Sequence, residues 1–123
     1  MTQHSSMTVE RWRGFPVAQQ LMMIANEMNR ASKLQGPEDG ERLRGSYERV
    51  LALTDLTIQA TERRALRREL LRWRDVVGGI YVGPGPDPRA HAQAFRVLLQ
   101  FHPETWAQLP HVTGAALPPG AGD

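Results

Sequence analysis

The chain has 123 residues and no cysteine, so a disulfide scaffold, a cysteine-ligated zinc site and a thiol nucleophile are excluded. A hydrophobic fraction of 41% is enough to bury one core, which fits a single domain and excludes a wholly disordered chain. The formal net charge is +2, and every one of the 15 basic residues except Lys33 is an arginine.

Signals for a membrane, a cofactor or a known reaction are missing from the sequence. The longest apolar stretch, residues 21–25, is far shorter than the roughly 20 residues that a membrane span needs. Residues 1–9 do not resemble a signal peptide, so we expect a cytoplasmic protein. No P-loop, nucleophile-elbow, zinc-protease or EF-hand motif occurs. We therefore expect no cofactor and a protein that is not an enzyme.

The first half of the chain predicts two helices after a polar start. Residues 1–13 lack periodicity, and we expect a flexible N-terminal arm that docks through Trp12 and Phe15. Pro16 then suits the first position of a helix, which ends at Gly36. The second helix begins at residues 37–39, and its two apolar stripes predict a central helix with neighbours on both sides. The apolar positions of the first helix are Val17, Leu21, Ile24, Ala25, Met28 and Ala31.

A third and a fourth helix follow. Thr61 is the expected N-cap of the third, whose 3–4 apolar spacing continues past Gly78 and Gly79 to about Val82. A short strand over residues 76–82 is the alternative. The core face of the third helix is predicted to hold Leu66, Leu70, Trp73 and Val77.

A Gly-Pro linker over residues 83–87 leads to the fourth helix, with Asp87 as N-cap and Pro88 at its first position. His91 is expected at the edge of the core on this helix. We expect an all-α domain over residues 14–109, namely an up-down bundle of three main helices plus the fourth, and a disordered tail over residues 110–123.

The excess positive charge lies on the third helix. Its arginines outnumber its acids, whereas the segments before and after it carry no positive excess. Guanidinium groups are strong bidentate donors to phosphates and carboxylates, so this surface can bind an acidic partner. A solvated helix face is the alternative interpretation, because Glu69 and Asp75 are spaced to pair with Arg72. The candidate partner-binding arginines are Arg63, Arg64, Arg67, Arg68 and Arg72.

Polar residues among the apolar positions of the first two helices predict a buried ion pair, with Glu27, Arg30 and Asp55 as its candidates. An unpaired buried charge costs several kcal/mol, so Asp55 requires a partner, either Arg30 or an arginine of the third helix. A helix-register ion pair is the simpler interpretation and a catalytic acid–base pair the alternative. Neither carboxylate has a histidine at metal-ligand spacing, so we expect no metal.

Met22 and Met23 cannot both face one core, so one of them is expected on an exposed or partner-covered face.

Residues 46–53 resemble the second helix of a tetratricopeptide unit, although Val50 replaces the usual alanine and no second unit follows. The size and helix order are similar to flagellar-export chaperones, but the tyrosine-rich N-terminal motif of that family is missing. Neither resemblance assigns a family, and both imply partner binding.

We therefore expect a small, chaperone-like or regulatory protein-interaction module. Its partner is another protein or a second copy in a homodimer, and no membrane is involved. Weak nucleic-acid binding through the arginine-rich third helix is the alternative.

Overall fold

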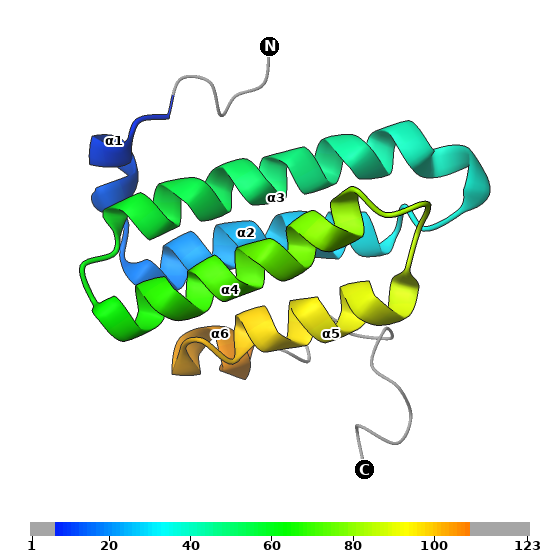
Figure 1. Cartoon of the computed structure of the whole chain (residues 1–123). Coiled ribbons are helices and arrows are strands. Elements are labelled where there is room, and N and C mark those ends of the chain that lie inside the picture. Colours follow the sequence, from blue (N-terminus) through cyan, green and yellow to red (C-terminus); the bar gives the residue numbers. More distant parts are fainter. Residues whose placement is uncertain (1–6, 109–123) are drawn as a thin grey trace.

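The computed structural model describes residues 7–108, and every regular element in that range is a helix, which confirms the all-α fold. Its long helices are α2 (Val17–Ser32), α3 (Gly40–Ala60), α4 (Arg64–Tyr81) and α5 (Pro88–Leu99). Consecutive long helices run in opposite directions, as the predicted up-down bundle requires (Figure 1). The tail expected over residues 110–123 and the first six residues of the expected arm lie outside the described residues.

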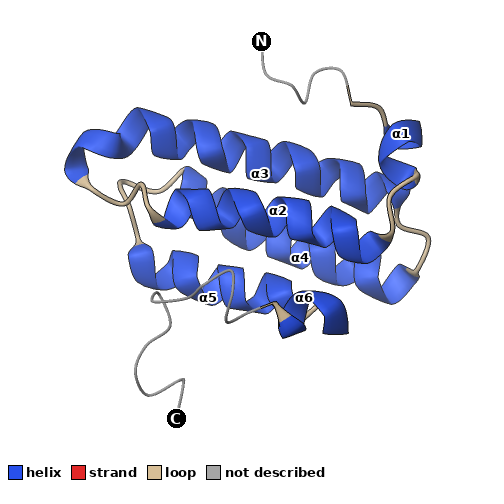
Figure 2. Ribbon diagram, turned by 180° about the vertical axis from the view of Figure 1, so that it is seen from behind, coloured by secondary structure: helices blue, strands red, loops and turns tan. Residues whose placement is uncertain are grey.

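The four long helices occupy the corners of a bundle. Helix α2 packs against α3 and α5, and α4 packs against the same two helices, so α2 and α4 lie at opposite corners (Figures 1 and 2). Because each helix has two neighbours, each buries a broad apolar stripe. The fully buried side chains at the centre include Leu21, Ile24, Met28, Val50, Leu53, Leu70, Val77, Leu98 and Leu99.

The N-terminal segment is more ordered than predicted. Helix α1 (Val9–Arg13) covers the C-terminal end of α3, whereas the polar sequence predicts a flexible arm as far as residue 13 (Figure 1). The Thr8 side chain caps this short helix by accepting from the Arg11 amide. The predicted docking through Trp12 is confirmed, because its indole ring is fully buried and touches Phe15 edge-on.

A 3-10 turn, η2 (Pro37–Asp39), leads into α3, which packs against neighbours on both sides as its two apolar stripes predict.

The junction between α3 and α4 differs from its prediction. Thr61, however, does not cap α4. Its hydroxyl donates to the Thr57 carbonyl and ends α3, and α4 begins after Arg63 without a side-chain cap.

Helix α4 continues through its two glycines to Tyr81, so the helix interpretation is confirmed and the strand alternative is wrong. A Cβ added at Gly78 or Gly79 would meet no atom within 4 Å, so neither glycine serves a close helix approach. The helix persists because Val77 remains in the core and Ile80 packs at its edge.

The last helices follow the linker. The Asp87 side chain accepts from the Ala90 amide and caps α5, as predicted. Helix α6 (Pro103–Ala107) then packs against α5 and α2. Its anchor is Thr105, which is fully buried and donates to the Leu99 carbonyl, whereas Trp106 on the same helix is 38% exposed.

Candidate protein-interaction surface

The predicted arginine surface exists, but several of its charges are already engaged. All five candidates are exposed, four of them on α4 and Arg63 just before it. Arg67 donates to the Thr61 carbonyl at 2.7 Å, and Arg72 lies 3.8 Å from the Glu69 carboxylate. Within residues 7–108, the structure gives no acceptor to Arg63, Arg64 or Arg68. The free cationic part of the surface is therefore smaller than the sequence indicates.

The two candidate methionines of α2 are less exposed than predicted. Met22 and Met23 are both partly buried and pack against the edge of the core. The bundle accommodates both because α2 has α3 on one side and α5 with α6 on the other. A helix between two neighbours can bury side chains on both flanks, so neither methionine is fully exposed, and a partner contact through Met22 or Met23 stays a prediction.

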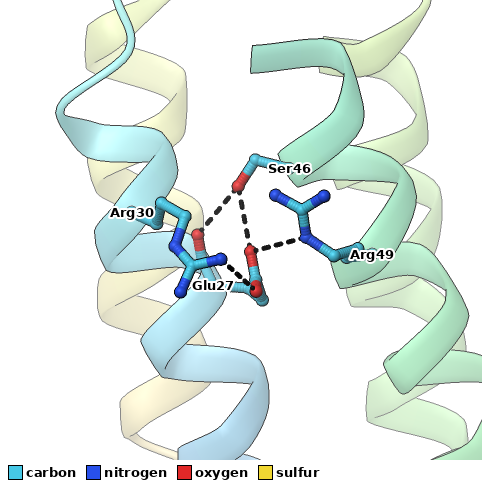
Figure 3. Close-up of polar contacts among 4 residues, drawn as sticks. All are labelled: Glu27, Arg30, Ser46 and Arg49. Carbon is cyan, nitrogen blue, oxygen red and sulfur yellow. Dashed lines mark hydrogen bonds and ion pairs between the residues drawn. The ribbon is translucent and has the colours of Figure 1, made fainter. Parts of the chain in front are cut away.

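Glu27 is the buried member of an ion pair with Arg30, whose own side chain is 62% exposed (Figure 3). The Glu27 side chain is only 9% exposed, and its Oε1 lies 3.1 Å from the NH1 nitrogen of Arg30. Ser46 on α3 donates to both the Glu27 carboxylate and its backbone carbonyl, each at 3.2 Å. Arg49 Nε lies 3.3 Å from Oε2 as an ion pair, but its N–H is not aligned for a hydrogen bond. The cluster joins α2 to α3.

Asp55 belongs to a different pair. Its carboxylate accepts from the guanidinium of Arg74 on α4, at 2.5 and 3.3 Å, so the third-helix alternative for its partner is the correct one. The Asp55 side chain is 43% exposed, and this pair is therefore a surface contact between α3 and α4. Since Glu27 and Asp55 bind different arginines, they do not form a joint acid–base pair.

A polar network that the sequence does not indicate surrounds His91. The imidazole is buried, with Nε2 2.9 Å from the Met28 carbonyl and Nδ1 2.9 Å from the Tyr47 hydroxyl. A carbonyl only accepts, so Nε2 carries the proton and Nδ1 accepts from Tyr47. Burial lowers the pKa of His91, and the bond to Met28 opposes that change in part. Burial likewise raises the pKa of Tyr47.

The His91 tautomer also determines whether Ser32 can be activated as a nucleophile. Its hydroxyl lies 2.9 Å from His91 Nε2, which resembles a nucleophile beside a base. A base needs an unprotonated Nε2, whereas this nitrogen donates to Met28. The Ser32 hydroxyl itself donates to the Met28 carbonyl at 3.0 Å. The network therefore links α2, α3 and α5 structurally and does not activate Ser32.

An apolar groove lies between α4 and α5, and the sequence analysis did not identify it. It encloses about 310 Å³. Trp73 and Ala94 are nearly fully buried and form its floor, where the Trp73 indole donates to the Ala94 carbonyl at 2.7 Å. Val76 and Val97 are 53% and 42% exposed on its two sides. The remaining lining residues are Glu69, Arg72, Ala90, Gln93 and Phe101.

The large apolar side chains that remain exposed in the described part of the chain gather on this half of the molecule. They belong to α4, to the linker that follows it, to α5 and to α6. Isolated exposed apolar residues are normal, whereas two of these five, Val76 and Val97, line one groove, which indicates a contact surface. These side chains are Leu71, Val76, Val82, Val97 and Trp106.

Comparisons with protein-family models, with curated proteins and with solved structures found no match to this chain. Over residues 7–108, no cluster of three or more histidine, aspartate or glutamate side chains is placed to hold a metal ion. No helix in the same range is both long and apolar enough to cross a lipid bilayer.

Proposed function

We propose that this chain is a non-enzymatic protein-interaction module that binds another protein, or a second copy of itself, in the groove between α4 and α5. The observation that carries the proposal is the pair Val76 and Val97. Each is about half exposed, and both border a groove with an apolar floor. Covering these side chains removes apolar surface from water, which is the main driving force of protein association.

The polar groups that could support chemistry are engaged in structural contacts, which favours binding over catalysis. His91 is held in the tautomer that cannot act as a base for Ser32. Glu27 is neutralised by the arginines beside it, and Asp55 is paired with Arg74.

Site-specific photo-crosslinking in cells of the source organism tests this function. A photoreactive residue is placed at position 76, at position 97 or at position 71. Leu71 is the matched control, because it lies on α4 with 46% exposure but does not line the groove. We expect one adduct, identified by mass spectrometry, from positions 76 and 97 and not from 71. Equal labelling at all three positions would contradict the proposal.

Nucleic-acid binding through the outer face of α4 is the second candidate. Arg64 and Arg68 are exposed and one helical turn apart, which favours a phosphate contact. Arg67, Arg72 and Arg74 already contact oxygen atoms of the chain, which leaves few free cations. Binding of this kind would weaken steeply with salt and with Arg64→Ala plus Arg68→Ala. No affinity for DNA or RNA at low salt would exclude it.

A further inference from the structure

The two walls of the groove carry apolar residues at the spacing that receives another helix. On α5, Ala90, Ala94 and Val97 follow one another at intervals of four and three residues, and Phe101 lines the groove just after the helix ends. This interval keeps side chains in one row along a helix and is the repeat of coiled-coil seams. The small Ala90 and Ala94 leave room for a partner backbone to approach. The groove therefore has the form of a trough for one more helix.

The α4 wall repeats this interval. The apolar residues Trp73 and Val76 are spaced by three residues along the same groove, and the charged Glu69 lines it four residues before Trp73. Helix α5 has 12 residues, which corresponds to about 18 Å of groove. An amphipathic helix of similar length fits this trough with its own apolar row against the Trp73 floor.

The charges beside the groove indicate which charges the flank of the docked helix should carry. Arg72 lines the α4 wall with an exposed guanidinium, and its contact to Glu69 is long at 3.8 Å. Arg68 is exposed one turn earlier on the same helix. The opposite wall contributes the neutral Gln93. Carboxylates beside the apolar row of the partner would therefore meet guanidinium groups on α4.

A second copy of this chain fits the arginine side of the groove, where Arg68 and Arg72 lie, less well. A two-fold interface in which α4 packs against its own copy would bring the Arg68 and Arg72 side chains of both copies together. Juxtaposed like charges oppose association. The charge pattern thus favours a different, acidic chain over a copy that pairs α4 with α4.

We infer that the occupant of the groove is an acidic amphipathic helix from another protein, with an apolar row and Glu or Asp along the flank that faces α4. This inference rests on the proposed function and names the chemistry of its partner. Helix-in-groove binding of this kind uses apolar anchors at helical spacing.

Fluorescence anisotropy with two designed peptides tests the inference. Both peptides span two heptads, carry Leu at positions a and d, and are held helical by a bridge on their outer face. One has Glu at positions e and g, and the other has Lys there. We expect the Glu peptide to bind at least about tenfold more tightly at low salt, with the difference falling as salt rises. Arg72→Glu together with Arg68→Glu should reverse the preference.

Matched variants locate the binding. Val97→Glu should weaken binding of the Glu peptide at least about tenfold, because the substitution places a charge in the apolar row of α5. Leu71→Glu adds the same charge outside the groove, at similar exposure, and should change the affinity about twofold or less. Circular dichroism and thermal melting confirm that both variants remain folded.

Three results would overturn the inference: equal affinity for the two peptides, binding that Leu71→Glu weakens as much as Val97→Glu, or no binding of the Glu peptide. If the crosslinks at positions 76 and 97 persist under any of these outcomes, the groove still binds protein and only the acidic-helix chemistry is wrong. Loss of the position-specific crosslinks refutes the proposed function itself.

Discussion

The indole Nε1 of Trp12 donates a 2.8 Å hydrogen bond to the Oγ1 of Thr57, and both residues are fully buried. The contact joins residues 45 positions apart and attaches α1 to α3. The Thr57 hydroxyl also donates to the Leu53 carbonyl, so its single proton and its acceptor lone pair are both used. The N-terminal helix is therefore fixed to the bundle by a satisfied buried polar contact.

Replacing this hydroxyl tests how strongly α1 is held. Thr57→Val keeps the side-chain shape but leaves the Trp12 N–H unsatisfied, which should lower the free energy of unfolding by about 1–3 kcal/mol. Thr54→Val is the matched control, since Thr54 is equally buried on α3 and donates only to the Val50 carbonyl. It should change stability by less than about 1 kcal/mol. Urea denaturation measures both, and equal losses would show that the indole contact contributes nothing.

The two carboxylates of the predicted ion-pair set should differ in their effect on stability. Glu27→Ala removes the buried carboxylate that accepts from Ser46 and Arg30 and pairs with Arg49, which should cost about 1–3 kcal/mol. Asp55→Ala breaks a pair that is screened by solvent and should cost less than about 1 kcal/mol. Urea denaturation compares the two variants. A larger loss for Asp55→Ala would contradict the assignment of Glu27 as the buried member.

The buried imidazole should make the protein sensitive to acid. Burial lowers the pKa of His91 in the folded state below the ordinary value of 6.5. Folding therefore favours the neutral imidazole. Its contribution to the free energy of unfolding is fully present above pH 6.5. It is lost as the pH falls below 6.5 and through the folded-state pKa, because the unfolded chain then binds the extra proton first.

Unfolding free energies measured between about pH 7 and pH 5 test this dependence. His91→Gln should be less stable at neutral pH but lose less stability on acidification than the wild type. His102→Asn removes a partly exposed histidine, keeps a residue suited to the N-cap of α6, and should change the stability at neutral pH less than His91→Gln does. Identical pH profiles for the wild type and His91→Gln would disprove the role of the buried imidazole.

Local sequence signals were sufficient where neighbouring residues decide the structure. The 3–4 spacing through Val77 and Ile80 predicts that α4 passes its glycines, and Asp87 caps α5 as its position before Pro88 indicates. Thr61 shows the limit of such signals. Threonine suits an N-cap, but its hydroxyl also reaches the carbonyl four residues earlier, and that bond ends α3 instead.

Contacts between helices required the structure. Glu27 and Arg30 are three residues apart, so their pairing is visible in the sequence, whereas Arg49 joins them only because of the register between α2 and α3. The groove depends on the same information. Val76 and Val97 read as ordinary members of amphipathic helices, and only the docking of α5 beside α4 shows that both border one exposed groove.

Chemical-shift mapping of the full chain with the crosslinked partner tests the central claim most directly. The groove account predicts that the amides of Val76, Ala90 and Val97 shift together with the Trp73 indole N–H at the groove floor. The Trp12 indole, bonded to Thr57 at the end of the bundle, should stay unchanged. Shifts centred on Arg64 and Arg68, with the Trp73 indole unaffected, would contradict the account and place the partner on the outer face of α4.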